Sequence, residues 1–416
     1  MDNTKSCGWC TFMKHFLFFL LFLFTFSSVK SQDYDSLRVS LLTVEPHSKA
    51  VWTIFGHTAL RLSDPAMNVD IVLNWGMFDF GRPNFILRFI EGKTDYFLNA
   101  SPFQNVILNH AIEEATVYEQ ILNIPDSEKY ALLEFLQINL LPENIEYRYN
   151  FFFDNCTTRP RDIIERFCGG TLNYPQQTQQ VTFRRLIHRY TQSYPWTELG
   201  IDCIIGSGAD SLITYRNELF LPLNLMDALN HSMIIDQDGD EQPVVFFSEL
   251  ILQSPYYQPI SIKLWDRPLL IGFVVFILYL ALVIIGYRKK YKFCLPFALL
   301  FFIAGAGGCI VAMLNFFSVH PCVQSNWNIL WLHPLHFIAC AGFFFRKSYR
   351  WIRWYHTVNF VLLSCFLLGW HWIPQELNIA CIPFILCLWV VSGLQMVKLK
   401  YRHCEGDSPK QSRKKN

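Results

Sequence analysis

The C-terminal third of the chain contains five long runs of apolar residues, and they restrict the possible folds more than any other feature. Each run is long enough, or nearly so, to cross about 30 Å of hydrocarbon as a helix, whose backbone polar groups are all hydrogen-bonded. The sequence therefore predicts a bundle of five transmembrane helices. The runs are Leu269–Tyr287, Pro296–Phe317, Ile329–Phe345, Val358–Trp372 and Ile379–Val397.

Basic residues alternate along the loops between these runs. The loops after the second and fourth runs contain no Lys or Arg, whereas the segments after the first, third and fifth runs are rich in both. This is the positive-inside pattern, in which basic loops stay in the cytoplasm. It predicts that everything before the first run lies outside the membrane and that the C-terminal tail lies inside. The basic residues are Arg288, Lys289, Lys290 and Lys292, then Arg346, Lys347, Arg350 and Arg353, then Lys398, Lys400, Arg402, Arg413, Lys414 and Lys415.

The N-terminus has the pattern of a secretory signal and agrees with this topology. Lys5 and Lys14 precede an apolar run, Phe16–Phe26, that is too short to cross a bilayer, and small residues follow it up to Ser31. An uncleaved N-terminal anchor is the alternative. The predicted division is a signal peptide (1–31), an extracytoplasmic domain (32–263), a five-helix transmembrane domain (264–400) and a cytoplasmic tail (401–416).

The extracytoplasmic part mixes strand and helix patterns. Val51–Leu62 is expected to form a strand or hairpin arm, Ile71–Phe80 a second strand, and Ser127–Leu140 an amphipathic helix. The whole chain has a formal net charge of +1, and the polar part has no basic stripe, so we expect no nucleic acid partner.

This part of the chain holds three cysteines: Cys156, Cys168 and Cys203. An odd number in an oxidising compartment leaves at least one thiol free. Parity predicts that Cys168 and Cys203 lie near each other, either as a disulfide or as two buried thiols, and that Cys156 is free.

Cys156 is the better candidate for a nucleophile. Asp154 and Asn155 are good helix-capping residues, and Pro160 is tolerated only in the first turn of a helix, so a helix is expected to begin close to Cys156. The positive end of the helix dipole stabilises a thiolate, and the unpaired backbone N–H groups there can hold an oxyanion.

A thiol nucleophile needs a base, and His57 is the best placed histidine. Gly56 before it allows close approach, and strand alternation puts His57 and Arg61 on one face. A third polar group should orient the imidazole; Asn74 on the next strand is the first choice and Asp79 the second. The alternative is that Cys156 and His57 are ordinary core residues.

The order of His57, a polar residue and Asn155-Cys156 resembles circularly permuted papain-like enzymes, among them the lecithin–retinol acyltransferase group. More closely, the chain resembles the Bacteroides-type lipoprotein N-acyltransferase family. It departs from the family where an arginine is expected, at Glu113-Glu114-Ala115. The matching stretches are Gly56–Arg61, Asn74–Phe80, Asp154–Arg159, Phe220–Pro222, His320, Asn326–Trp331 and Pro334.

The resemblance implies an α+β fold: a papain-like (circularly permuted) extracytoplasmic domain followed by a five-helix transmembrane bundle. It implies an acyltransferase of the bacterial inner membrane, multi-pass, with its catalytic domain in the periplasm. Cys156 would take an acyl chain from a membrane phospholipid as a thioester, with His57 and Asn74 as catalytic partners. The acceptor would be the α-amine of a diacylglyceryl-cysteine lipoprotein. No metal or other cofactor is needed, because the ester already carries the activation of the acyl group.

Four further residues are candidates for substrate binding. Arg159 and Arg161 either hold a phosphate headgroup or are ordinary charges on a helix surface. Asn328 and Trp331 either shape a lipid groove or belong to an interfacial aromatic belt. His333 and His336 have helical spacing but no further ligands, so no metal site is expected there.

Two other functions stay open from the sequence. A membrane-anchored papain-like thiol hydrolase of cell-wall peptides would use the same Cys–His pair, although it would rarely need five membrane helices. A non-catalytic periplasmic sensor or assembly module would only bind; a free cysteine at a helix start beside a Gly-His strand argues against it.

Overall fold

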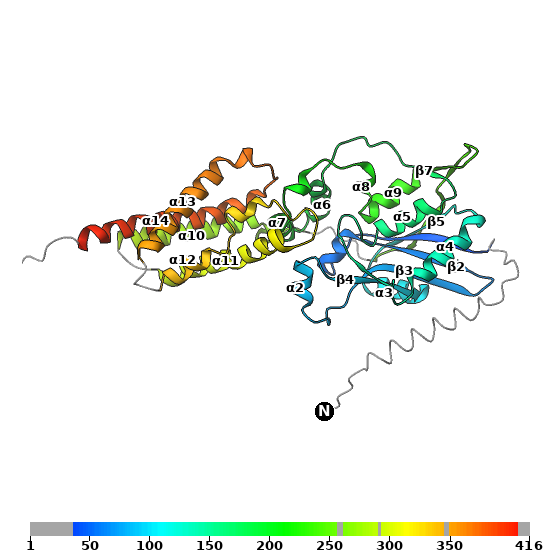
Figure 1. Cartoon of the computed structure of the whole chain (residues 1–416), viewed down its shortest axis with the longest axis horizontal. Coiled ribbons are helices and arrows are strands. Elements are labelled where there is room, and N and C mark those ends of the chain that lie inside the picture. The colour runs from blue at the N-terminus through cyan, green and yellow to red at the C-terminus, as the bar shows by residue number, and fades with distance from the viewer. Residues whose placement is uncertain (1–35, 256–260, 290–292, 345–348, 407–416) are drawn as a thin grey trace, which may run out of the picture.

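The computed structural model describes residues 36–255, 261–289, 293–344 and 349–406. The predicted signal peptide, and the tail after residue 406, lie outside the described residues. The molecule is elongated, with a mixed α/β domain at one end and a bundle of long helices at the other (Figure 1).

The α/β domain is built on a seven-stranded sheet in which every neighbouring pair of strands is antiparallel. The strand order is β10-β5-β1-β2-β3-β4-β6, so the two strands that carry His57 and Asn74 are neighbours near the middle. The strands are β1 (Arg38–Val44), β2 (His57–Asp64), β3 (Val69–Met77), β4 (Asp95–Pro102), β5 (Val117–Leu122), β6 (Glu146–Arg148) and β10 (Val245–Leu252). A smaller sheet pairs β7 (Thr171–Asn173), β8 (Met233–Ile235) and β9 (Glu241–Pro243).

Both faces of the main sheet are covered. Leu41 and Leu42 are adjacent on β1 and point to opposite faces, yet both are buried. Leu41 belongs to the large core under three helices, whereas Leu42 packs with Val106 of a single helix on the other face. The three helices are α4 (Asp126–Asn139), α5 (Thr158–Phe167) and α9 (Pro222–Asn230), and the single helix is α3 (Phe103–Ile112). The other short elements of the domain are η1 (Val51–Phe55), α2 (Phe85–Ile90), α6 (Phe183–Thr191), α7 (Pro195–Ile204), η2 (Ser207–Asp210) and α8 (Tyr215–Glu218).

The structure confirms the predicted helix near Ser127–Leu140 as α4, and it refines the two predicted strands. Val51–Leu62 is divided by Gly56, whose φ of 79° is unfavourable for other residues; a 3₁₀ turn precedes it and β2 follows. A β-carbon on Gly56 would lie 2.5 Å from the carbonyl oxygen of Val44. The second strand, β3, ends at Met77 and not at Phe80.

Three helices of the bundle are long and apolar enough to cross a membrane among the described residues, and not the five that the sequence predicted. They are α10 (Pro268–Arg288), α11 (Cys294–Phe317) and the segment Ile379–Val397, which comprises η7 (Ile379–Cys381) and most of α14 (Ile382–Gly406). The run Ile329–Phe345 instead forms η4 (Trp327–Leu330) and a short α12 (His336–Gly342), with Pro334 between them. The run Val358–Trp372 lies in α13 (Tyr349–Leu368) and η6 (Trp370–Trp372). The first half of α13 carries Arg350, Arg353 and His356, so the helix as a whole is too polar to count as a membrane span. The remaining short turn, η3 (Leu264–Asp266), precedes α10.

A buried polar network joins the α/β domain to the outer loops of the bundle. Arg184 on α6 is fully buried and pairs with Asp202 of α7 at 2.7 Å and with Asp210 at 2.6 Å. Side-chain amides from the bundle loops donate to Asp202 and to the backbone that follows it. These donors are Asn378 to the Asp202 carboxylate, Asn328 to the Asp202 carbonyl, Asn326 to the Cys203 carbonyl and Gln375 to the Ile205 carbonyl.

The predicted proximity of Cys168 and Cys203 is wrong. Both thiols are free; Cys168 is buried in the core beneath the sheet, whereas Cys203 packs with the helical bundle and lies 3.9 Å from the sulfur of Cys381. Cysteine parity could not predict this, because a thiol behaves as a small apolar side chain and needs no partner.

We expect Arg184→Met to destabilise the junction strongly, because Asp202 and Asp210 would lose their buried counter-charge. Removing one partner of a buried ion pair typically costs about 3–5 kcal/mol. The matched control is Arg185→Met. Its side chain is 66% exposed and lies 3.7 Å from Glu376, so it should cost at most about 1 kcal/mol. Thermal unfolding of the two full-length variants in detergent measures the difference; equal midpoints would contradict the role of Arg184.

Candidate active site

The turn before α5 is fixed by one buried side chain, Asn155. Its Oδ1 accepts the backbone N–H groups of Thr157 and Thr158, each at 2.8 Å, and its Nδ2 donates to the carbonyls of Phe151 and Phe220. Thr158 begins α5, so Cys156 lies at the start of this helix, as the sequence predicted. The hydroxyl of Thr157 lies 3.2 Å from that of Thr58, and both are buried, which ties the turn to β2.

His57 is the first residue of β2, and its imidazole lies between Asn74 and Cys156. Nε2 donates to Oδ1 of Asn74 at 3.2 Å. Because an amide oxygen can only accept, Nε2 carries the proton, and Nδ1 is left to interact with the thiol. The thiol of Cys156 is hydrogen-bonded to this ring, and the backbone N–H of Thr58 also donates to the sulfur. The structure thus brings together the three residues predicted as catalytic.

Gly76 provides the backbone conformation of this arrangement. It has a φ of 88° and lies where the pairing of β3 with β4 shifts register between Asn74 and Met77. A β-carbon there would lie 3.4 Å from Cβ of Cys156 and 3.5 Å from the ring of Tyr149. The bulge therefore lets β3 present Asn74 to His57 while its backbone passes close beside the thiol.

The mutual attraction of His57 and Cys156 shifts their pKa values in the opposite direction to burial. Burial alone would raise the pKa of the Cys156 thiol, but the charge of His57 and hydrogen bonds from His57, Thr157 and Thr58 lower that pKa below its usual value. Burial also acts to lower the pKa of His57, and the charge and hydrogen bond of Cys156, with the bond to Asn74, raise it. Both shifts favour the thiolate–imidazolium form, which is the reactive form of a cysteine nucleophile.

Sequence reasoning missed a second polar cluster beside His57. The carboxylate of Glu113 lies 3.3 Å from Nδ1 of His110 and 3.8 Å from Nε2 of His47. Burial and the charge of His57 lower the pKa of His110. The i,i+3 spacing of His110 and Glu113 at the end of α3 is the one local signal for this cluster, whereas His47, in the loop after β1, is too remote in sequence for any local spacing to place it there. Glu113 belongs to the stretch Glu113-Glu114-Ala115, in which the family resemblance led us to expect an arginine.

The other predicted residues are engaged elsewhere. Asp79, the second choice for orienting His57, accepts the backbone N–H of Gly81 at 2.8 Å. Arg159 pairs with Asp154 at 2.6 Å, and its guanidinium stacks 3.5 Å from the ring centre of Tyr147.

Arg161, Asn328 and Trp331 all turn inward. Arg161 is buried and donates to Asp162 and to the carbonyl of Arg216. Asn328 is also buried, and its Oδ1 accepts from Nε1 of Trp331 at 2.8 Å. The polar groups of these three side chains are therefore already hydrogen-bonded inside the protein, and a substrate contact by them stays a prediction.

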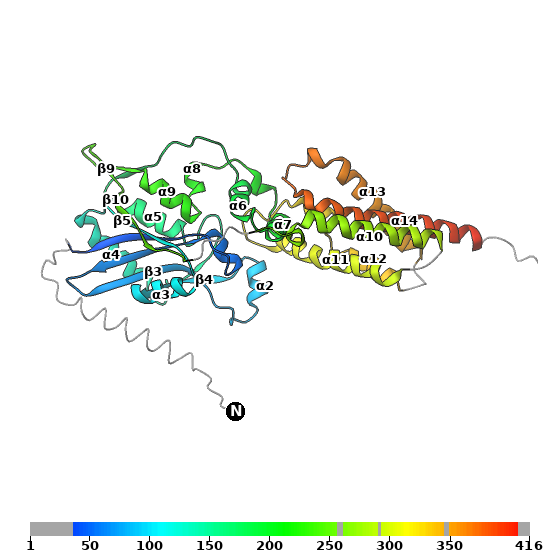
Figure 2. The ribbon, with the colours of Figure 1, turned by 180° about the vertical axis from the view of Figure 1, so that it is seen from behind.

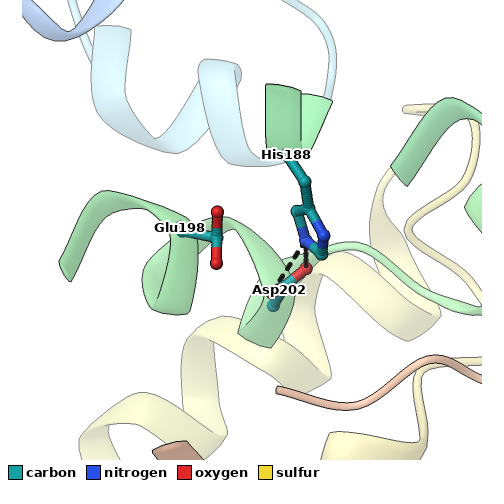
Figure 3. A group of neighbouring side chains, drawn as sticks. All are labelled: His188, Glu198 and Asp202. Carbon is teal, nitrogen blue, oxygen red and sulfur yellow. Dashed lines mark hydrogen bonds and ion pairs between the residues drawn. The ribbon is translucent and has the colours of Figure 1, made fainter. Parts of the chain in front are cut away.

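One group among the described residues has donor atoms close enough for a metal ion: His188, Glu198 and Asp202, whose ligand atoms lie within 4.8 Å of one another (Figure 3). The Asp202 carboxylate, however, already accepts from Arg184, His188 and Asn378. Glu198 accepts from the hydroxyl of Thr191. Because Asp202 is paired with Arg184 and Glu198 is already hydrogen-bonded, we interpret this group as part of the junction between the domains and not as a metal site.

Two family models match most of the chain. The Lnb N-terminal periplasmic domain matches residues 27–189, and the Lnb transmembrane domain matches residues 261–403. The chain belongs to the Lnb family. The family resemblance inferred from the sequence motifs is therefore confirmed, and the chain is a membrane protein with a periplasmic domain. Comparison with curated proteins and with solved structures gave no match. The papain-like part of the fold prediction therefore stays a prediction.

Lnb family membership indicates an enzyme of the acyltransferase type. The candidate site places a thiol, an imidazole and an amide side by side, which is the set of groups that a cysteine nucleophile requires.

We expect Cys156 to react with iodoacetamide at lower pH than an ordinary thiol does. The thiolate is the reacting form, so its fraction rises as pH passes the thiol pKa, and that pKa is lowered here. In His57→Ala the imidazole that lowers the thiol pKa is lost while burial, which raises it, remains. The inflection in the plot of alkylation rate against pH should therefore move to higher pH. Mass spectrometry of the Cys156 peptide across a pH series measures the inflection. Cys168, whose pKa burial raises, is the internal control. An unchanged inflection in His57→Ala would contradict the coupling.

Proposed function

We propose that this protein is a lipoprotein N-acyltransferase. It would move an acyl chain from a membrane phospholipid through a thioester on Cys156 to the α-amine of a diacylglyceryl-cysteine lipoprotein. The observation that carries the proposal is the Cys156–His57–Asn74 arrangement in a chain of the Lnb family, joined to membrane-spanning helices.

In the first half-reaction, the thiolate of Cys156 attacks the carbonyl carbon of a phospholipid ester. The C–S bond forms and the ester C–O bond breaks. The leaving lysophospholipid oxygen takes the proton that the His57 imidazolium holds. Asn74 keeps the ring in the required orientation through its bond to Nε2.

The developing oxyanion needs a hydrogen-bond donor near Cys156. Asn155 already occupies the N–H groups of Thr157 and Thr158, so these two are not open to a substrate. We propose the backbone N–H of Cys156 itself for this role, at the positive end of the α5 dipole.

In the second half-reaction, the α-amine of the acceptor attacks the thioester carbonyl. The C–N bond forms and the C–S bond breaks, so the thiolate is released and an amide is made. His57, neutral after the first step, accepts the proton that the amine loses. No metal or nucleotide enters this scheme.

The presence of membrane-spanning helices is evidence in favour of lipid substrates. Donor and acceptor both reside in the bilayer, so an enzyme that uses both must hold its site at the membrane surface. We propose a multi-pass protein of the bacterial inner membrane with four parts: a signal peptide (1–31), a periplasmic catalytic domain (32–263), a transmembrane domain (264–400) and a cytoplasmic tail (401–416). The inner membrane is where a periplasmic domain can meet newly made lipoproteins.

Transfer should require both members of the Cys–His pair. Purified protein is incubated with phospholipid vesicles and a diacylated lipopeptide with a free N-terminus, and mass spectrometry detects triacylated peptide and lysophospholipid. Cys156→Ala and His57→Ala should lower transfer by at least about a hundredfold, and Cys156→Ser should retain little, because an alkoxide is much harder to form than a thiolate.

Cys168→Ala is the matched control, since this buried thiol lies outside the site, and it should keep transfer near the wild-type rate. Release of free fatty acid without amide would reject the transferase. Cleavage of cell-wall peptide without lipid turnover would favour the thiol hydrolase, and a protein with no turnover of either substrate would favour a sensor or assembly module.

A further inference from the structure

The segment that follows β3, residues 78–92, exposes a cluster of large apolar side chains. It contains α2, a six-residue helix with no buried residue. Ile86 is 74% exposed and Phe80 62% exposed, and Leu87 and Phe89 are about half exposed. A helix exposed to water on this scale costs free energy unless another apolar phase covers it. We call residues 78–92 the α2 segment.

The α2 segment is held at the outer end of a membrane helix. The N–H of Val319 donates to the carbonyl of Glu91 at 2.9 Å, and Nε2 of His320 donates to the carbonyl of Phe89 at 2.7 Å. These partners directly follow α11, whose last residues, Phe316 and Phe317, are themselves about two-thirds exposed. Both ribbon views place α2 on the side of the α/β domain that faces the bundle (Figures 1 and 2).

A row of aromatic rings connects this segment to the candidate active site. Phe78 is two residues after Gly76, which lies against Cys156. From Phe78 the ring-centre distances are 4.8 Å to Phe80, 4.9 Å on to Phe85, 6.2 Å on to Phe89 and 5.8 Å on to His320. The row therefore runs without a break from Phe78, two residues after Gly76, to the outer end of α11.

We propose that the α2 segment inserts into the outer leaflet of the membrane and that the aromatic row guides a phospholipid acyl chain to Cys156. The occupant is the bilayer, because the spanning helix α11 fixes the membrane boundary and α2 is hydrogen-bonded to the residues that follow it. A second protein would have to cover the same surface at that boundary in competition with lipid. The acyl-donor part of this inference rests on the proposed function; the insertion part does not.

Insertion is tested first, without relying on activity. Full-length Cys156→Ala protein is reconstituted in vesicles of phosphatidylethanolamine and phosphatidylglycerol that contain a phospholipid with a photoactivatable diazirine in its acyl chain. After illumination, mass spectrometry should find lipid adducts on peptides covering residues 78–92 and on α11, but not on α4, at residues 126–139. Adducts on α11 with none on residues 78–92 would overturn the insertion.

The guiding role is tested by a charge on the exposed face. Ile86→Asp should lower the rate of Cys156 acylation by vesicle phospholipid about tenfold, since one buried apolar side chain is worth about that factor. Acylation by a water-soluble p-nitrophenyl ester should be unchanged. Ile138→Asp, on α4 and 47% exposed, is the matched control and should leave both rates unchanged.

The outcomes separate the two proposals. Equal phospholipid rates in Ile86→Asp and wild type would overturn the guiding role, and so would equal losses with both donors. If wild-type protein is acylated by neither donor, the proposed function fails and the guiding role fails with it, whereas the lipid adducts still decide the insertion.

Discussion

The position of the candidate active site relative to the helical bundle depends on the buried cation of Arg184. A guanidinium with no exposure is tolerable only because two carboxylates, Asp202 and Asp210, neutralise it and accept its N–H groups. Those carboxylates in turn organise the junction, since Asp202 accepts from Asn378 and Asp210 from the N–H of Glu376, both in the loop before η7. The α/β domain is thereby fixed to the loops at the outer end of the bundle by directional bonds, and not by apolar packing alone.

A rigid junction matters for the proposed reaction, because both of its substrates would be confined to the plane of the membrane. A lipid ester can reach a thiol only if the thiol lies at a fixed height above that plane, within the reach of the chain. The second contact, between the α2 segment and residues 319–320, sets the same height from the other side of the domain. Two separate attachments also restrict rotation, which a single junction would permit.

Sequence reasoning succeeded where the determining interactions are local. Pro160 and Asn155 specify the start of α5 within six residues, so the residue pattern by itself places Cys156 at a helix N-terminus. His57 and Asn74 are on consecutive antiparallel strands, for which pairing is the simplest expectation. Local patterns could not predict that Arg161 and Asn328 are buried. Their partners, the carbonyls of Arg216 and Asp202, are 55 and 126 residues away, and no pattern reveals that such groups turn inward.

The prediction of five membrane spans was wrong for a related reason. Hydropathy measures composition, so it could not show that the run containing Pro334 folds as a 3₁₀ turn and a seven-residue helix. Composition also could not reveal that the apolar side chains of residues 78–92 are exposed, because the sequence does not distinguish an exposed phenylalanine from a buried one. Only the contact with residues 319–320 indicates which apolar phase would cover them.

The coupling between Cys156 and His57 also provides an order for the proposed reaction. Before acylation, the thiolate raises the pKa of His57 against the effect of burial, which favours the doubly protonated imidazolium. Formation of the thioester removes the negative charge from the sulfur. The burial that remains lowers the pKa of His57, so the ring loses its proton when the lysophospholipid oxygen requires one. The neutral imidazole is then the base that an incoming amine needs. In the proposed reaction, His57 thus acts as acid in the first half-reaction and as base in the second. Acylation of Cys156 changes the pKa of His57 between these two roles. Water could use this base equally well, so selectivity for the amine must come from how the acceptor is held and from how much water the membrane surface excludes.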